Sequence, residues 1–268
     1  MSSQAPAYPL FLDLVQQPVL VVGGGTVGLR KVRGLVECAA RVTVVSPAFV
    51  AGFDNLPDVE RIQATYAQTH MARKMWRLVF ACTDSPAVNA QVQKHAVAQG
   101  ILICRTDNPE EGDFSNGATA RVGATRKADG RGIEGVGNIG GIVLAVSTAG
   151  ASPVLAARIC REAAAGIDPV LPMLADLLEG WRAILKTSIG NLPARRALLH
   201  RLAGDEMELI LRERGAEAAQ REFAKWHEET RTQAAARAAD APMAPPSAAP
   251  AVKPTEAAAP LRRPSGAA

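Results

Sequence analysis

The sequence predicts an α/β fold built on a Rossmann-type, doubly wound parallel sheet, which a smaller helical domain follows. Short runs of β-branched and other apolar residues alternate with helix-length stretches as far as Asp107. The runs at residues 19–22, 78–82 and 101–104 are apolar at every position, as expected for parallel strands that helices cover on both faces. A glycine-rich turn joins the first run to the first helical stretch, where a nucleotide-binding turn stands in such folds.

The elements of the sheet domain follow from these runs and from the residues that end them. Strands are predicted at residues 19–22, 42–45, 61–64, 78–82 and 101–104, and helices at residues 26–38 and 86–99. Ser46 and Pro47 close the second strand, and Gly100 ends the second helix. Strands and helices that alternate in this way are typical of a doubly wound sheet.

The part that follows Asp107 is first rich in glycine and then helical. Two further strands are predicted at residues 116–124 and 142–147, with an exposed loop at residues 126–140 between them. Ser152 is a good N-cap residue with Pro153 at the first helical position, so a helix is expected to begin there. Two more helices are predicted at residues 169–186 and 194–212, and a marginal, alanine-rich helix at residues 215–238.

Four segments along the chain are therefore expected. The nucleotide-binding domain takes residues 1–115, a central region residues 116–150, the helical domain residues 151–238 and a tail residues 239–268. Residues 241–268 hold 10 alanines and 7 of the 18 prolines, a composition that predicts a flexible, disordered tail.

Composition excludes several classes of protein. The chain has 268 residues, of which 48% are hydrophobic, so it is neither wholly disordered nor collagen-like. It lacks a long uninterrupted apolar run and the layout of a secretory signal, which predicts a cytoplasmic protein without a membrane segment. The four cysteines stand far apart, which argues against a zinc site and a disulfide framework. The net charge of +4 comes without interleaved aromatic residues, so no nucleic-acid partner is predicted.

The sharpest motif is the glycine turn at residues 23–28, which satisfies G-x-G-x-x-G directly after a predicted strand and at the start of a helix. Gly23 permits the tight turn, Gly25 lets the backbone approach a pyrophosphate, and Gly28 allows close packing of helix on strand. The helix N-terminus then offers N–H groups to the phosphates. The predicted cofactor-binding residues are Gly23, Gly24, Gly25, Thr26, Val27, Gly28, Ser46, Pro47, Ala48 and Thr83.

The end of the second strand leaves the cofactor's phosphate preference open. No carboxylate stands there to accept the ribose hydroxyls, although Ser46 could hydrogen-bond a ribose. Arg30, Lys31 and Arg33 could attract a 2′-phosphate, or they form a solvated face of the first helix.

Two aspartates are candidates for the crevice because each follows a predicted strand at the carboxyl edge of the sheet. Asp84 follows Thr83 and is either a crevice residue or the cap of the helix that begins near Pro86. Asp107 could accept a proton beside a nicotinamide, or it could serve only in the turn that leads to Pro109.

The order of several motifs resembles the siroheme synthase family, in particular its precorrin-2 dehydrogenase/sirohydrochlorin ferrochelatase module in a short form without the methyltransferase domain. The resemblance covers about residues 8–185. Its most specific part is the S-T-x-G-x-S-P-x-L-A pattern at residues 147–156. It is carried by residues 8–12, 21–25, 30–31, 42–47, 81–84, 107–109 and 145–156.

The resemblance implies a homodimer whose central region, residues 116–150, pairs strands between subunits. It implies that NAD⁺ takes a hydride from precorrin-2 to give sirohydrochlorin, and that some members then insert Fe²⁺ or Co²⁺ as a substrate. Asp107 matches the family's general base. Because precorrin-2 carries eight carboxylates, basic residues such as Arg105, Arg121 and Arg126 would help to hold it. The substrate-binding candidates are Arg105, Arg121, Thr148 and Ser152, and no residue is assigned to a resident metal.

Two departures bear on the predicted function. Cys104 stands where the family often has asparagine, and Gly117 replaces a proline of the family's Phe-x-x-Pro segment. Both lie on the substrate side, so NAD-dependent dehydrogenation is the principal hypothesis and metal insertion is secondary. The alternative is a non-catalytic module that binds NAD or a tetrapyrrole.

Overall fold

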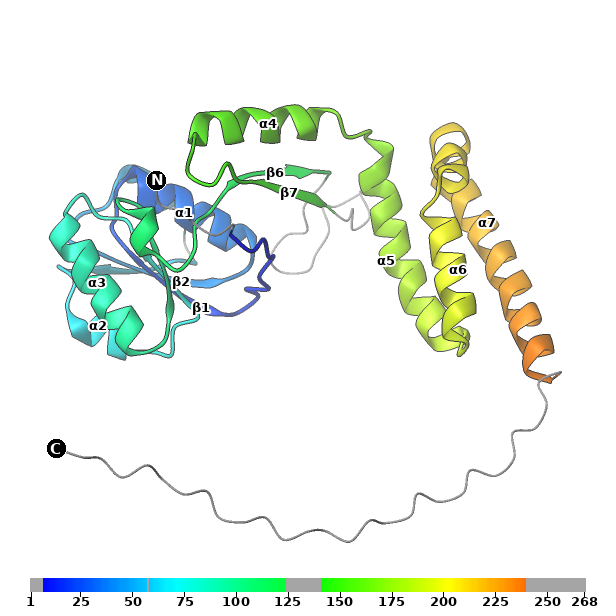
Figure 1. The fold of residues 1–268 in the computed structure, drawn as a ribbon, viewed down its shortest axis with the longest axis horizontal. Coiled ribbons are helices and arrows are strands. Elements are labelled where there is room, and N and C mark those ends of the chain that lie inside the picture. The colour runs from blue at the N-terminus through cyan, green and yellow to red at the C-terminus, as the bar shows by residue number, and fades with distance from the viewer. Residues whose placement is uncertain (1–6, 57, 124–140, 240–268) are drawn as a thin grey trace, which may run out of the picture.

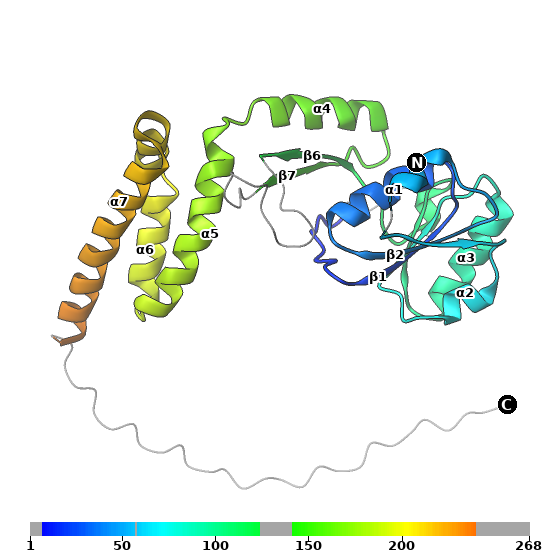
Figure 2. The ribbon, with the colours of Figure 1, turned by 180° about the vertical axis from the view of Figure 1, so that it is seen from behind.

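The computed structural model describes residues 7–56, 58–123 and 141–239. Figures 1 and 2 show, in chain order, the α/β domain, a ribbon of strands beneath a helix, and a group of further helices. The predicted tail, the loop at residues 126–140 and Arg126 lie outside the described residues.

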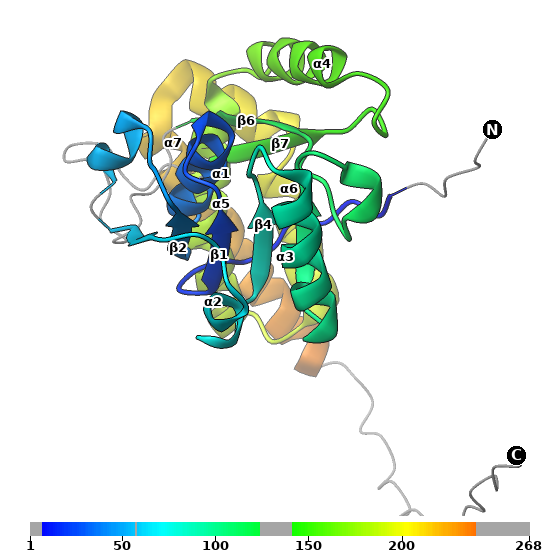
Figure 3. The same ribbon diagram turned by 90° about the vertical axis from the view of Figure 1, so that its left-hand side faces the viewer.

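Five parallel strands form the sheet of the first domain and confirm the predicted fold class. They are β1 (Pro18–Val22), β2 (Arg41–Ser46), β3 (Glu60–Gln63), β4 (Leu78–Ala81) and β5 (Leu102–Arg105). Their order is β3-β2-β1-β4-β5, so the chain reverses its direction of winding between β1 and β4. The view in Figure 3 shows β2, β1 and β4 side by side. Ligands of open α/β sheets bind at such a switch point, outside the carboxyl ends of the strands.

Burial on both faces explains why the central strands β1 and β4 are apolar throughout. In β1, Val19 and Val21 join the core cluster that α1 (Thr26–Glu37) covers through Val32. Leu20 and Val22 join the opposite cluster, which includes residues of α3 (Pro86–Ala98). The domain also contains α2 (Gln68–Ala72) and two 3₁₀ turns, η1 (Ala51–Asn55) and η2 (Pro109–Glu111).

An antiparallel ribbon follows the sheet domain. Strand β6 (Ala118–Val122) pairs with β7 (Ile142–Val146), and α4 (Pro153–Ala165) packs on both strands. The predicted N-cap is confirmed, because the amide of Leu155 donates to the Ser152 hydroxyl oxygen over 3.2 Å.

The last three helices differ in one respect from the prediction. They are α5 (Val170–Ser188), α6 (Leu192–Leu202) and α7 (Asp205–Ala239). The single helix predicted at residues 194–212 is wrong, because the chain leaves the helical path at Ala203 and Gly204 and starts α7. A second irregularity lies inside α7, where Gly215 adopts φ 78°.

The helix predicted as marginal at residues 215–238 is instead a main contributor to the helical core. Ala219, Phe223 and Trp226 are buried against α5 and α6, while most of the residues between them are polar. The ring of Phe223 stacks on Trp181 at 4.8 Å and on His227 at 5.6 Å. Tertiary packing stabilises this helix, which its own alanine-rich sequence would not do as strongly.

Substitution of Phe223 by alanine is expected to destabilise the helical domain by about 3–5 kcal/mol, because it removes the ring between Trp181 and His227. Met173→Ala on α5 is the control, since Met173 is 41% exposed and should cost under about 1 kcal/mol. Urea unfolding followed by tryptophan fluorescence measures both changes. Equal losses in the two variants would contradict this account of the core.

Candidate cofactor and catalytic crevice

The glycine turn between β1 and α1 is as tight as the motif predicts. Gly23 adopts φ +119°, and a Cβ on it would lie 2.6 Å from the carbonyl oxygen of Cys82 at the end of β4. A Cβ on Gly28 would overlap the carbonyl oxygen of Gly23. Both positions therefore require glycine. Gly23 is needed for its positive φ, and Gly28 is needed because any side chain there would clash with the turn.

Two further glycines give the turn one packed side and one open side. A Cβ on Gly24 would overlap the Ala48 carbonyl oxygen in the loop after β2, whereas a Cβ on Gly25 would meet no atom within 4 Å. Gly25 is the N-cap of α1, and Thr26 and Val27 are exposed beside it. The open space above an uncapped helix N-terminus fits the pyrophosphate of a dinucleotide.

A hydrogen bond within the loop after β2 stabilises the conformation of that loop. The Ser46 hydroxyl is buried and donates to the carbonyl oxygen of Ala48 over 2.7 Å, while Pro47 and Ala48 are exposed. In this conformation Ser46 shapes the loop, and the exposed backbone of the loop is the surface available to an adenosine ribose.

Asp107 lies just beyond β5, where it pairs with Arg105 through two bonds. The Arg105 Nη2 donates to Oδ2 over 2.6 Å, and Nε donates to Oδ1 over 3.2 Å. The hydrogen bond from Arg105 lowers the pKa of Asp107, burial opposes this, and the Asn89 side chain lowers it further. Asp107 is therefore a carboxylate at neutral pH, with 21% of its side chain exposed.

Asn89 is a residue of this site that the sequence analysis missed. It is fully buried in α3, its Oδ1 accepts from the Thr83 hydroxyl over 2.7 Å, and its Nδ2 donates to the Thr83 carbonyl over 3.0 Å. An asparagine inside a helix gives no signal in sequence, because only the fold places it against the end of β4. Asn89 thus fixes the predicted cofactor residue Thr83 and also lowers the pKa of Asp107.

The alternative role of Asp84 as a helix cap is wrong, since the cap of α3 is Ser85. The Ser85 hydroxyl oxygen accepts from the amide of Val88 over 3.4 Å, and Pro86 takes the first position of the helix.

The two cysteines beside the crevice are not nucleophiles. Burial raises the pKa of Cys82 to about 12 and also raises that of Cys104, so both thiols are protonated at neutral pH. Both are buried residues, and so is Cys160.

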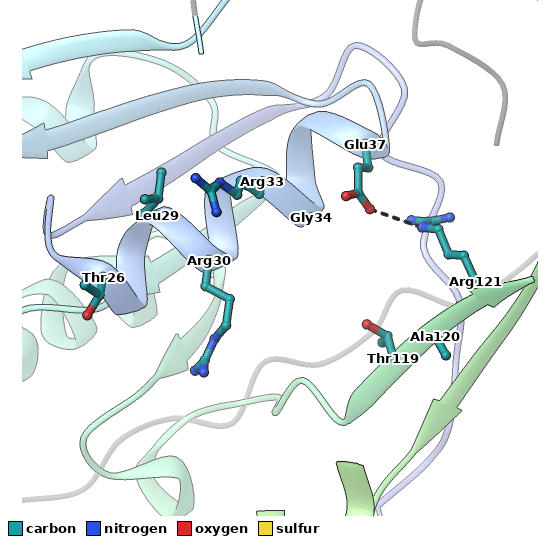
Figure 4. Close-up of a pocket in the computed structure, with 9 residues that line it drawn as sticks. All are labelled: Thr26, Leu29, Arg30, Arg33, Gly34, Glu37, Thr119, Ala120 and Arg121. Atoms are coloured by element: carbon teal, nitrogen blue, oxygen red, sulfur yellow. Dashed lines mark hydrogen bonds and ion pairs between the residues drawn. The ribbon is translucent and has the colours of Figure 1, made fainter. Parts of the chain in front are cut away.

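Arg121 lies in a pocket of about 640 Å³ between α1 and β6, which Thr26 of the glycine turn also lines. Its Nε donates to the Glu37 carboxylate over 3.2 Å, as the dashed line in Figure 4 marks. Arg30 projects from α1 into the same space, and Arg33 also lines it. Neither Arg30 nor Arg33 has an ion-pair partner among the described residues, so the pocket presents cationic donors to an anion.

Thr148 and Ser152 bind each other at the start of α4. The Thr148 hydroxyl donates to the Ser152 carbonyl over 3.0 Å, and the Ser152 amide donates back over 3.1 Å. Their hydrogen bonds stay within this turn, whereas Arg105 binds Asp107 and Asn89 binds Thr83 at the ends of neighbouring strands. The predicted substrate-binding residues therefore lie in three places. Arg105 lies beside Asp107, Arg121 lines the pocket between α1 and β6, and Thr148 and Ser152 form the turn before α4.

The described residues contain no cluster of three or more histidine, cysteine or acidic side chains that could hold a metal ion. In the same part of the chain, none of the helices has both the length and the apolar character needed to span a membrane.

Comparisons with known proteins find relatives that share a nucleotide-binding domain and the fold. Residues 10–118 match the family described as "Putative NAD(P)-binding". The chain is 33% identical to the siroheme synthase of Nitrosococcus oceani over 195 residues, which are 70% of this chain and 37% of that protein. It is 32% identical to that of Gluconacetobacter diazotrophicus over 219 residues, 80% of this chain and 41% of the relative.

A solved structure, "SirC, precorrin-2 dehydrogenase", shares the fold with a TM-score of 0.60 at 23% identity, over 83% of this chain and 100% of that one. The chain spans about two fifths of the length of the siroheme synthases that it matches. The resemblance to siroheme synthases that the motifs indicated is thus confirmed. The part of the chain that resembles them begins with an NAD(P)-binding domain at residues 10–118.

Proposed function

We propose that the protein is an NAD-dependent dehydrogenase that converts precorrin-2 to sirohydrochlorin in siroheme or related tetrapyrrole synthesis. The observation that carries this proposal is the ionised, partly exposed Asp107 at the carboxyl edge of the same sheet that holds the open glycine turn. The relation to siroheme synthases supplies the class of substrate.

The reaction removes two electrons and two hydrogens from the substrate, one hydrogen as hydride and one as a proton. When bound, the nicotinamide ring of NAD⁺ accepts the hydride. Asp107 accepts the proton, because its carboxylate is ionised and lies at the crevice. The turn at residues 23–28, the exposed loop at residues 47–48 and Thr83 hold the cofactor.

A substrate with eight carboxylates needs cations near the crevice, and the pocket between α1 and β6 supports such a role. Arg121 and Arg30 both line it, so carboxylate side chains of the tetrapyrrole would form charge-assisted hydrogen bonds there. Thr148 and Ser152 would contribute through the backbone turn that they stabilise.

We further propose a homodimer in the cytoplasm. Apolar residues on α4 face solvent in the single chain, with Val154 80% exposed and Leu155 and Ile159 also exposed. A two-stranded ribbon that is covered on only one face is marginally stable by itself. Pairing with the ribbon of a second copy would therefore stabilise it. The four free thiols suit a reducing compartment.

Incubation of the purified protein with precorrin-2 and NAD⁺ tests this function. We expect stoichiometric NADH and the sirohydrochlorin spectrum, with NADP⁺ in a parallel reaction to measure cofactor preference. Stoichiometric binding without NADH would overturn the proposal in favour of a non-catalytic tetrapyrrole-binding module. Added Fe²⁺ or Co²⁺, supplied with sirohydrochlorin and no NAD⁺, separately tests metal insertion.

A further inference from the structure

We propose that Arg105 is a positioning residue, which fixes the Asp107 carboxylate as a proton acceptor, and is not a substrate-binding residue as the sequence suggests. This inference rests on the proposed role of Asp107. It assigns to the buried guanidinium a function inside the protein, and it leaves recognition of the substrate's carboxylates to other cations.

The first argument is that every guanidinium nitrogen of Arg105 already has an acceptor. Nε and Nη2 form a fork onto the two oxygens of Asp107, at 3.2 and 2.6 Å. Nη1 donates to the Gln93 side-chain oxygen over 3.0 Å and to the Glu111 carboxylate. Only 5% of the Arg105 side chain is exposed, so an incoming carboxylate would have to displace one of these partners.

The second argument is that four elements build the cluster around Arg105. Strand β5 ends at Arg105, so Asp107 follows in the turn two residues later, while α3 supplies Gln93 and η2 supplies Glu111. The Gln93 side chain also donates to the backbone carbonyl of Glu111. Because several partners hold Arg105 in place, its two parallel hydrogen bonds fix both the position and the plane of the Asp107 carboxylate.

The charges around Asp107 determine its protonation state. Arg105 from β5 is the cation in direct contact, and Glu111 from η2 shares that cation. Helix α3 contributes the uncharged Asn89 and Gln93, and the end of β4 contributes the neutral Thr83. Without Arg105, burial would raise the pKa of the carboxyl group against only the Asn89 side chain and a backbone hydrogen bond, so the protonated form, which cannot accept a proton, would persist to higher pH.

The test compares Arg105→Met and Arg105→Lys with the wild-type protein. Arg61→Met is the matched control, because Arg61 makes an exposed ion pair with Asp54 in the same domain. Two quantities are measured: the titration of the Asp107 carboxyl by ¹³C NMR, with its signal assigned from Asp107→Asn, and the pH dependence of kcat and KM for precorrin-2.

We expect the Asp107 titration to move to higher pH in Arg105→Met and to an intermediate pH in Arg105→Lys, which keeps the charge but loses the fork. The acid limb of kcat should move in the same direction, with kcat about 10-fold or more lower and KM changed less than about threefold. The control variant should match the wild type in all of these measurements.

An unchanged Asp107 titration in both Arg105 variants would overturn the proposal. So would a rise in KM with unchanged kcat and pH profile, which is the signature of lost substrate binding. If Arg105→Met does not fold, Arg105→Lys alone decides, because it retains the cation. If the wild type does not oxidise precorrin-2, the proposed function fails, whereas the NMR titration still shows whether Arg105 holds Asp107 as an anion.

Discussion

Substitution of Asp107 by asparagine is expected to lower kcat for precorrin-2 oxidation by about 100- to 10,000-fold, the usual contribution of a positioned general base. The amide has nearly the shape of the carboxylate but accepts no proton. The affinity for NAD⁺ should stay within about twofold, because the glycine turn is untouched. Steady-state kinetics and calorimetric titration with NAD⁺ measure the two effects.

A matched control for this prediction is Asp113→Asn, which removes a carboxylate of the same domain whose Oδ2 accepts from the amide of Ile103. Full turnover in Asp107→Asn would refute the assignment of the base. Equal losses in the two variants would mean that the fold, rather than proton transfer, had been damaged, and circular dichroism would show this.

The pH dependence of stability follows from the same carboxyl group. Arg105 lowers the pKa of Asp107 in the folded state below its ordinary value near 3.8. The pair therefore stabilises the native protein fully at neutral pH, and this contribution is lost as the pH falls below about 4 and the carboxylate is protonated. Asp107→Asn should remove this part of the acid sensitivity.

Gly28→Ala is expected to abolish NAD⁺ binding, with Kd raised by about 100-fold or more. The added Cβ would overlap the carbonyl oxygen of Gly23, so either the turn opens or α1 moves off the sheet. A clash of this kind against backbone costs about 1–3 kcal/mol or more, since neither partner is the flexible end of a side chain. Calorimetric titration with NAD⁺ measures the loss, and thermal unfolding measures the strain.

Gly34→Ala is the control in the same helix, because a Cβ on Gly34 would meet no atom within 4 Å. It should stabilise α1 by up to about 1 kcal/mol, the difference in helix propensity between the two residues. Normal NAD⁺ binding by Gly28→Ala would show that the turn does not hold the cofactor.

Much of the sheet domain could be predicted because its signals are local. An apolar run of strand length needs two covering layers, and a glycine pattern between a strand and a helix needs a close backbone turn, whatever the rest of the chain does. The positions of Gly23 and Gly28 in the structure meet these requirements. The cap at Ser152 was equally local, since it depends on a hydroxyl three residues before an amide.

The helical domain shows where local signals fail. The stretch at residues 215–238 has only two large apolar side chains, Phe223 and Trp226, and these pack it onto α5 and α6, which the local sequence does not reveal. The break between α6 and α7 falls at Gly204, a residue of low helix propensity that the predicted helix ran through.

The sequence by itself determined the fold class and the glycine turn, because periodicity and turn chemistry act over a few neighbouring residues, and it offered Asp107 as a candidate base through its place after a strand and the family resemblance. Only the tertiary structure decided what the other polar groups do. It turned Arg105 inward onto Asp107, brought Asn89 of α3 against Thr83, and placed Arg121 in a pocket with α1. A buried charged side chain must be paired with groups that the fold brings next to it. The spacing of residues in the sequence does not reveal which helices or strands supply those groups.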